Sequence, residues 1–499
     1  MWETNDDVGM SMAAHGYGMA AVSTPNIVFS NVLWGAFVRS IPSINGVLGY
    51  SSATLGTLIL IGGVVLFSLY QLRAGLVTAL CMLCLILTRP TLLPQFTINS
   101  GLLLIAALLC WHLYAQQKGT WTLWLGCLLA FLSYLIRKEE FLLVLAIALP
   151  LLPWRVILQS NTFKRAILLL IVAIVGSSVI NHYAYQGKQW NAFNELKPSL
   201  APLIDFGAGA HLKPRDDILD QHNFSANDID LISNWFFVDP QIASPQTLQS
   251  MLSQLGPLPV QEQSLTKAWN GIKTLWHPNL KPLILAAIII LLLKPSWPVV
   301  ASWGLFILAI FLIGLLGRPS VIRVYIPLVS LLAIAPFFLA NEVSWRNHIT
   351  ALVLVAAAGM NATNVFTTAS THKATFEQTQ KDLTNFPLGA PTINWGGGFP
   401  FEATYPVLGS SPNAMRYRFY GLGGFTLAPF SVPFAEEQKG RGLITQFTEE
   451  KGIAIMANER RLGYLDNYCR QRLNGEPQIM PSREYGALMI NQTRCNQTK

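Results

Sequence analysis

The feature that most constrains this chain is a series of apolar blocks, several of which approach the length of a membrane-spanning helix. A perpendicular transmembrane helix needs roughly 20 mainly apolar residues. The blocks occupy residues 52–72, 76–87, 97–115, 120–136, 141–153, 166–183, 283–293, 297–316, 324–339 and 349–360. Only 12% of the 499 residues are charged, about half the usual fraction for a soluble protein. We therefore expect a mainly α-helical protein, a polytopic transmembrane bundle of about ten helices whose shorter spans are extended by flanking Trp, Tyr or Lys. A water-soluble multidomain enzyme and a disordered chain are excluded.

Polar segments divide the chain into five predicted regions. These are a first outer loop with an acidic motif and an amphipathic helix (1–51), transmembrane helices (52–183), a helical extracytoplasmic loop (184–278), transmembrane helices (279–361) and an extracytoplasmic soluble α/β domain (362–499). In the long loop, Ser225 or Asn227 can cap one helix, and Ser244 precedes another that ends near Gly256. The last region alternates short β-like runs with helical patterns, which is typical of a small α/β domain.

The basic residues are distributed in a way that favours a membrane protein with an anion site. The net charge is +8, yet no run of Lys or Arg exceeds two residues, so we expect no nucleic-acid partner. Alternation of the spans places the first loop, the long loop and the last region on one face. Six basic residues lie on that face, against the usual preference for the cytoplasmic side: Arg39, Arg89, Arg137, Lys138, Arg318 and Arg323. We infer that a function on that face requires some of them.

The first candidate site is the acidic segment around Asp6 and Asp7, close to the start of the chain. One carboxylate near an acceptor hydroxyl can take its proton as a general base, while its neighbour orients the substrate. The alternative is that Asp7 is simply the N-cap of a short helix.

Three further segments supply cations to the same predicted face. Arg137 and Lys138 begin a charged turn whose arginine can contact a phosphate in bidentate fashion, although pairing with Glu139 and Glu140 is the alternative. Arg318 and Arg323 flank a turn that contains Pro319, and they suit an anionic headgroup or act as snorkelling anchors. Arg89 precedes Pro90 and Pro94, which we expect to break a helix and to line a cavity.

The remaining sequence patterns give only weak support for a catalytic or metal site. The sequence has no H-E-x-x-H, Walker A or G-x-S-x-G motif. Asp216, Asp217 and Asp220 could bind a metal, but a solvated helix start is the better interpretation. Cys81 and Cys84 form a C-x-x-C inside an apolar block, where helix packing explains them. Cys469 and Cys495 can pair in an oxidising compartment, and the sequence leaves this open.

With these motifs, the chain resembles the GT-C superfamily of membrane glycosyltransferases, which use polyprenyl-phosphate sugars. The resemblance rests on Asn5-Asp6-Asp7-Val8-Gly9-Met10 with Asn31-Val32-Leu33-Trp34-Gly35, on Arg137-Lys138-Glu139, on Gly317-Arg318 through Arg323, and on Asn227-Asp228 with Trp235 and Asp239. It implies that Asp7 or Asp6 is the catalytic carboxylate and that Arg137, Lys138, Arg318, Arg323 and Arg89 bind the donor phosphate. Members of the family have a transmembrane helix before the acidic loop. We therefore expect the natural start to lie upstream, with the first helix missing here.

The resemblance implies an inverting glycosyltransferase that transfers a hexosyl or pentosyl group in polysaccharide biosynthesis. Its partners would be a polyprenyl-phosphate-linked sugar, a glycan or lipid acceptor of the cell envelope, and membrane lipid. We expect no cofactor and no metal, because Arg and Lys would hold the leaving phosphate, and we expect a bacterial inner-membrane protein acting on the periplasmic face. The alternatives are a transporter or flippase for lipid-linked oligosaccharide, and a glycan polymerase or ligase that uses a diphosphate-linked donor.

Overall fold

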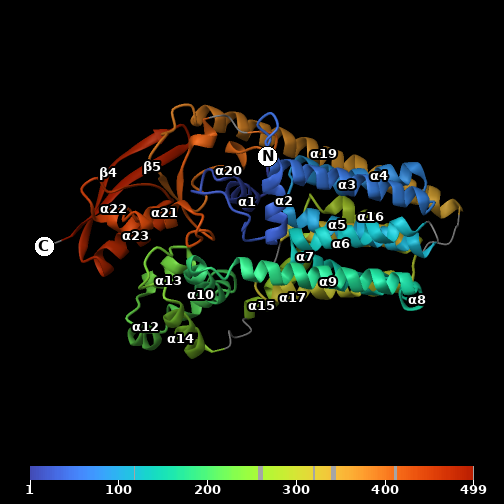
Figure 1. Ribbon diagram of the computed structural model, residues 1–499, viewed down its shortest axis with the longest axis horizontal. Coiled ribbons are helices and arrows are strands. Elements are labelled where there is room, and N and C mark those ends of the chain that lie inside the picture. Colours follow the sequence, from blue (N-terminus) through green and yellow to red (C-terminus); the bar gives the residue numbers. More distant parts are fainter. Residues whose placement is uncertain (117–118, 257–261, 319–320, 339–343, 410–412, 498–499) are drawn as a thin grey trace.

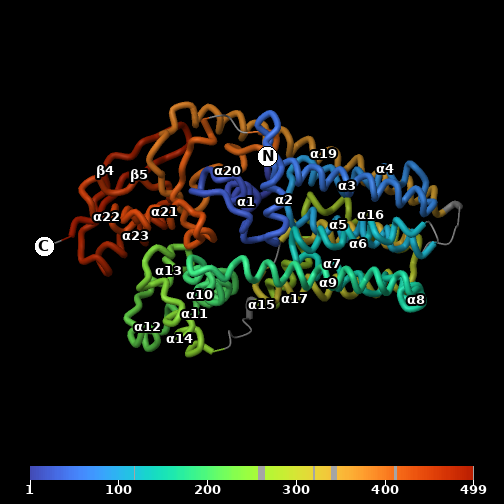
Figure 2. Tube along the Cα trace, in the orientation of Figure 1, coloured from blue at the N-terminus to red at the C-terminus, as the bar shows by residue number. Residues whose placement is uncertain are grey.

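The protein consists of an elongated helical bundle with a second part at one end (Figure 1). We expect this second part to lie outside the membrane and call it the soluble part. The computed structural model describes residues 1–116, 119–256, 262–318, 321–338, 344–409 and 413–497. The soluble part combines the C-terminal sheet with the helices of the long loop, and both lie at the same end of the bundle (Figures 1 and 2). Two N-terminal helices, α1 (Asn5–His15) and α2 (Val32–Ser40), lie where the two parts meet.

Each predicted apolar block overlaps a helix of the bundle. Its helices are α3 (Gly49–Gln71), α4 (Leu76–Leu92), α5 (Phe96–Ala115), α6 (Thr120–Ile136), α7 (Lys138–Ala148), α8 (Trp154–Gln159), α9 (Asn161–Ala184), α15 (Glu262–Lys273), α16 (Lys281–Leu293), α17 (Trp297–Leu315), α18 (Ile322–Ile334) and α19 (Ser344–Asp382). Within the described residues, α3, α5, α9, α17 and α19 are long and apolar enough to cross a membrane. A sixth span is possible if residues 264–276 and α16 are taken together as one span, although the two helices meet at a bend of 87°. The helical, membrane-type architecture is confirmed, whereas ten full-length spans are not.

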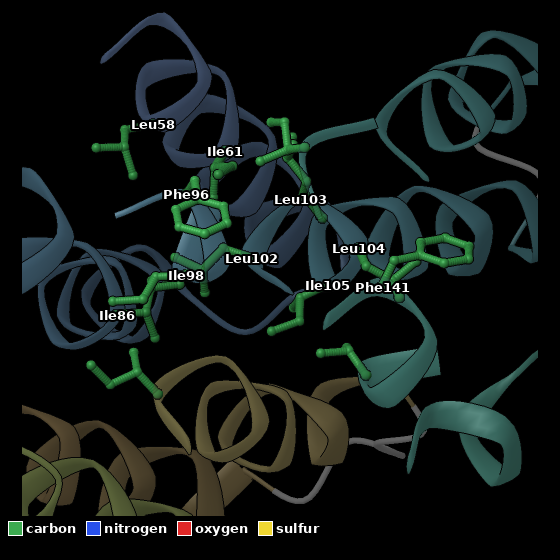
Figure 3. Close-up of a cluster of buried hydrophobic side chains, with 14 of the residues drawn as sticks. Leu58, Ile61, Ile86, Phe96, Ile98, Leu102, Leu103, Leu104, Ile105 and Phe141 are labelled. Atoms are coloured by element: carbon green, nitrogen blue, oxygen red, sulfur yellow. The ribbon is translucent and has the colours of Figure 1, made fainter. Parts of the chain in front are cut away.

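Helix α5 forms the centre of the bundle, and its whole apolar window is buried. Its Leu102 and Ile105 lie in the cluster of buried side chains drawn in Figure 3. The helix packs against α3, α6, α7 and α18. Gly101 allows α18 to approach, because a Cβ at this position would lie 2.4 Å from the ring of Pro327. The start of α5 is therefore held in a fixed place at the end of the bundle.

Three elements differ from the sequence-based expectation. Residues 264–276 were expected in the extracytoplasmic loop, but α15 packs on α17, where Gly314 leaves room for Ala268. The boundary expected after residue 361 falls inside α19, which continues to Asp382. Pro90 does not end its helix: α4 extends to Leu92 with Pro90 inside it.

The long loop and the C-terminal region share one hydrophobic core. The loop contributes α10 (Asn191–Leu200), α11 (Ala208–Leu212), α12 (Asp216–Gln221), α13 (Ala226–Ser233) and α14 (Pro245–Leu255). Ser225 caps α13 in a capping box with Asp228, and Ser244 caps α14, as predicted. The buried Asp228 carboxylate pairs with Arg472 at 2.8 Å, which joins the loop to the C-terminal region.

The C-terminal region is the predicted α/β unit. Its elements are β1 (Thr392–Trp395), α20 (Phe401–Thr404), β2 (Phe419–Leu422), α21 (Val432–Gln438), α22 (Leu443–Thr448), β3 (Ile453–Met456), α23 (Glu459–Arg472), β4 (Gly475–Tyr485) and β5 (Leu488–Gln497). The strand order is β2-β1-β3-β5-β4, with β2, β1 and β3 parallel and β5 and β4 antiparallel. Cys469 and Cys495 form a disulfide between α23 and β5, with a Cα–Cα distance of 5.6 Å.

Candidate functional site

The carboxyl ends of the parallel strands face the N-terminal helix across a cavity of about 330 Å³. We call this space the interdomain cavity. Glycine-rich turns after β1 and β2 form one wall, and Asn5 and Asp6 of α1 form part of the opposite wall. In open α/β sheets, ligands bind beyond the carboxyl ends of parallel strands, at the point where the strand order reverses. Here β1 is that point, since its neighbours β2 and β3 lie on opposite sides.

Asp6 and Asp7 take different positions although they are adjacent in sequence. Asp6 lines the interdomain cavity, is about one-third exposed, and lies 3.3 Å from Nη1 of Arg323. Asp7 is fully buried. Helix α1 begins at Asn5, so both carboxylates lie in its first turn, where the helix dipole favours negative charge, and Asp7 is not the N-cap.

The Asp7 carboxylate is held by three hydrogen bonds. It accepts from the hydroxyl of Thr4 at 3.0 Å, from the hydroxyl of Tyr50 at 3.0 Å and from the backbone N–H of Phe96 at 3.1 Å. Burial, with a smaller effect of Asp6, raises the pKa of Asp7 to about 8 despite these bonds. Asp7 thus ties α1 to the first residues of α3 and α5 and fixes the position of Asp6.

A third carboxylate near this motif was not singled out from the sequence. Glu402 of α20 accepts a hydrogen bond from the backbone N–H of Asn5. Desolvation and the negative charge of Asp6 raise the pKa of Glu402. Nothing in the local sequence around Glu402 indicates this neighbour, because it depends on α20 packing against α1.

A second and larger cavity, of about 650 Å³, lies beside the first. We call it the basic cavity, because Arg137, Lys138 and Lys197 line it. Phe29 lines both cavities. The Arg137 guanidinium lies over the rings of Phe29 and Phe96, at 5.9 and 5.4 Å from the ring centroids. The basic cavity and the acidic motif are therefore connected through two aromatic side chains.

The predicted pairing of this basic turn with its own acids is present in part. Glu139 lies 3.1 Å from Nε of Arg137 and 3.8 Å from Nζ of Lys138. Lys197, from the long loop, adds a cation that was not recognised in the sequence. Desolvation and the positive charge of Lys138 lower the pKa of Lys197. Like charges this close favour an anion between them.

The other predicted phosphate ligands are placed differently. Arg89 pairs with Glu3 at 2.6 Å, and both side chains are largely buried. Arg318 pairs with Asp205 and Arg323 with Asp6. Three predicted phosphate ligands, Arg89, Arg318 and Arg323, line neither of the two cavities. Pro90 and Pro94 do not line them either. Pro319 and Ser320, in the turn after Arg318, lie outside the described residues.

Two bulky residues next to the cavities have a backbone conformation that L-amino acids rarely adopt. Val28 has φ +68° and lines the basic cavity. Trp235, which belongs to the long loop, has φ +71° and lines the interdomain cavity. Such strained positions cost of the order of 1–3 kcal/mol and cluster at functional sites.

Within the described part of the chain, no group of three or more His, Cys, Asp or Glu side chains is arranged to hold a metal ion. In the acidic segment considered above, Asp217 pairs with Arg215 at 2.7 Å, as at a solvated helix start. Comparison of the chain with models of protein families, with curated proteins and with solved structures gave no match.

Proposed function

We propose that the protein is an inverting membrane glycosyltransferase that uses a polyprenyl-phosphate sugar. The observation that carries the proposal is the position of Asp6 in the interdomain cavity, one aromatic side chain away from a cavity lined by three cations. In this arrangement a base and an anion site lie in two neighbouring cavities that share Phe29. Transfer from a phosphate-linked donor requires both groups near the reacting sugar, and a donor that spans the two cavities would meet them.

In the proposed reaction, a hydroxyl of the acceptor attacks the anomeric carbon of the donor sugar. Its proton passes to the carboxylate of Asp6, the new C–O bond forms, and the bond between the anomeric carbon and the phosphate oxygen breaks. Polyprenyl phosphate leaves with both electrons of that bond, stabilised by Arg137, Lys138 and Lys197. A single displacement of this kind inverts the anomeric configuration. Asp7 is a positioning residue, since it is buried and does not line the cavity.

The proposed location is a bacterial inner membrane, with the soluble part in the periplasm. The disulfide between Cys469 and Cys495 supports an oxidising compartment for the C-terminal region. The location of the long loop and the C-terminal region at the same end of the bundle supports a common compartment for both. We further propose that the shorter apolar helices α4, α6 and α18 also cross the membrane, their ends extended by flanking polar residues.

The test is transfer by purified protein in lipid nanodiscs supplied with radiolabelled polyprenyl-phosphate sugars and an extract of cell-envelope glycans. We expect labelled product from the wild-type protein and about 10²-fold less, or still less, from Asp6→Asn. Labelled lipid that crosses a liposome membrane without forming a glycosidic bond would instead identify a flippase. Transfer from diphosphate-linked donors alone would identify a polymerase or ligase.

A further inference from the structure

We propose that the sheet-side wall of the interdomain cavity binds an oxyanion carried by the acceptor sugar, with Arg461 as its cationic ligand. The inference names the class of acceptor and so rests on the proposed function. The predicted acceptor is a glycan unit that bears a carboxylate or a phosphate.

Among the described residues, no acidic side chain forms an ion pair with Arg461. This arginine lies in the first turn of α23, after β3, and lines the cavity. Its Nε atom is buried and makes no hydrogen bond with any described residue. The charged and titratable groups that act on it are Tyr464 and Arg460, and neither is a carboxylate. A partly desolvated guanidinium without an anion loses some of its solvation, whereas an oxyanion in the cavity would pair with it in bidentate fashion.

The turn after β1 is shaped around this guanidinium. Gly396 has φ +85°, and a Cβ added to it would lie 2.0 Å from Nη1 of Arg461. Only glycine allows the backbone to lie against the guanidinium here, so the turn fixes the direction of the side chain. At the next residue, Gly397, an added Cβ would meet open space.

A second polar group on this wall also lacks a partner. Asn394 is 5% exposed and lines the cavity. Its Nδ2 donates to the carbonyl of Gly396 at 3.2 Å, while its Oδ1 is buried and accepts no hydrogen bond from the described residues. A buried acceptor of this kind lacks the hydrogen bond that such groups normally make. A sugar hydroxyl in the cavity would donate that bond.

The charges of the two walls orient the acceptor. Asp6 also lines the cavity, from helix α1, and although Arg323 pairs with it, the carboxylate disfavours a second oxyanion beside it. An anionic sugar would therefore place its charged group at Arg461 and turn a hydroxyl toward Asp6, which is the orientation that deprotonation needs.

Binding to the full chain in nanodiscs tests the proposal without requiring transfer. The probes are glucuronate and glucose 6-phosphate, with neutral glucose and geranyl phosphate as comparisons, measured by isothermal titration calorimetry. We expect both anionic sugars to bind more tightly than glucose. Arg461→Gln should raise the Kd of both anionic sugars about tenfold or more, which is the usual effect of losing a charged hydrogen bond. The control is Arg460→Gln, which changes an exposed arginine on the same helix and should have no effect.

Two glycine variants provide a second test variant and a matched control, in case Arg461→Gln folds poorly. Gly396→Ala should displace Arg461 and weaken anionic sugars, whereas Gly397→Ala should leave their affinity unchanged. Equal affinity for glucose and glucuronate, or a loss confined to geranyl phosphate, would overturn the proposal, the latter by assigning Arg461 to the donor. Either result leaves the transfer assay with Asp6→Asn as an independent test of the proposed function.

Discussion

A carboxylate oxygen of Asp6 lies 3.3 Å from Nη1 of Arg323, which joins the acidic motif of α1 to the beginning of α18. The two residues are 317 positions apart. Both side chains remain about one-third exposed, and of the two only Asp6 lines the interdomain cavity. Arg323 thus holds the Asp6 carboxylate at the cavity wall while Asp7 anchors the turn from behind.

The first prediction separates the two adjacent aspartates. Asp6→Asn should reduce transfer by about 10²-fold or more, the usual contribution of a general base. Asp7→Asn should reduce it less than about tenfold near pH 7, because a carboxyl with a raised pKa is largely protonated there and an amide resembles it. Initial transfer rates at saturating donor concentration measure the loss in each variant. A larger loss for Asp7→Asn than for Asp6→Asn would assign the base to Asp7.

The second prediction concerns stability against pH. Because the pKa of Asp7 rises from 3.8 to about 8 on folding, the native state keeps a proton that the unfolded chain loses between these values. Asp7 should therefore stabilise the protein most at low pH, and this contribution should fall as the pH rises toward 8. Between about pH 5 and pH 8, the Tm of the wild type should fall more steeply with pH than the Tm of Asp7→Asn. Parallel curves would contradict the assignment.

The third prediction addresses the basic cavity. Arg137→Gln and Lys197→Gln should each raise the KM for a polyprenyl-phosphate donor about tenfold, since each removes a charge-assisted contact with phosphate. Lys373→Gln is the control, because Lys373 is 78% exposed on α19 and pairs only loosely with Glu377, at 3.9 Å. A similar change in KM for Lys373→Gln would indicate a general effect of surface charge.

The fourth prediction concerns the link between the long loop and the C-terminal region. Arg472→Met should destabilise the soluble part by about 3 kcal/mol, because it leaves the buried Asp228 charge unpaired. In limited proteolysis, Arg472→Met should then be cut within residues 184–278 at lower denaturant concentrations than the wild type. The double variant Arg472→Met/Asp228→Asn should recover part of the loss, and failure to do so would show that the packing of Arg472 matters more than its charge.

The fifth prediction uses the disulfide. Cys469→Ser should destabilise the C-terminal region by about 2–4 kcal/mol. Only the wild-type protein should change mobility on a gel when reduced. Cys110 and Cys127 are buried and free, and they serve as internal controls that react with maleimide only after unfolding. Reaction of Cys495 with maleimide in native wild-type protein would contradict the pairing.

The sequence predicted the parts of this fold that depend on local patterns. Apolar blocks predicted the helices of the bundle, and Ser225 and Ser244 predicted two helix starts, because capping acts within one turn. The acidic motif and Arg137 were recognised from their unusual position beside apolar blocks. Tertiary packing decided the rest. Glu402 and Lys197 have no local signal, and only the meeting of α20 with α1 and of α10 with the bundle shows their place.

Sequence alone also could not rank the predicted cations. Arg89 and Arg137 look equivalent in the chain, yet one is neutralised by Glu3 and the other lines a cavity. Likewise, the glycines at 396 and 397 are indistinguishable in composition, and only the position of Arg461 separates them.

Helix α19 runs without interruption for 39 residues, from the apolar bundle into the soluble part. A helix of this length is a rod of roughly 58 Å. This continuous helix joins the bundle to the sheet on that side, so we expect the two parts to move together there. For the proposed transferase, we therefore expect entry and release of substrates to depend on small adjustments of the turns that line the interdomain cavity.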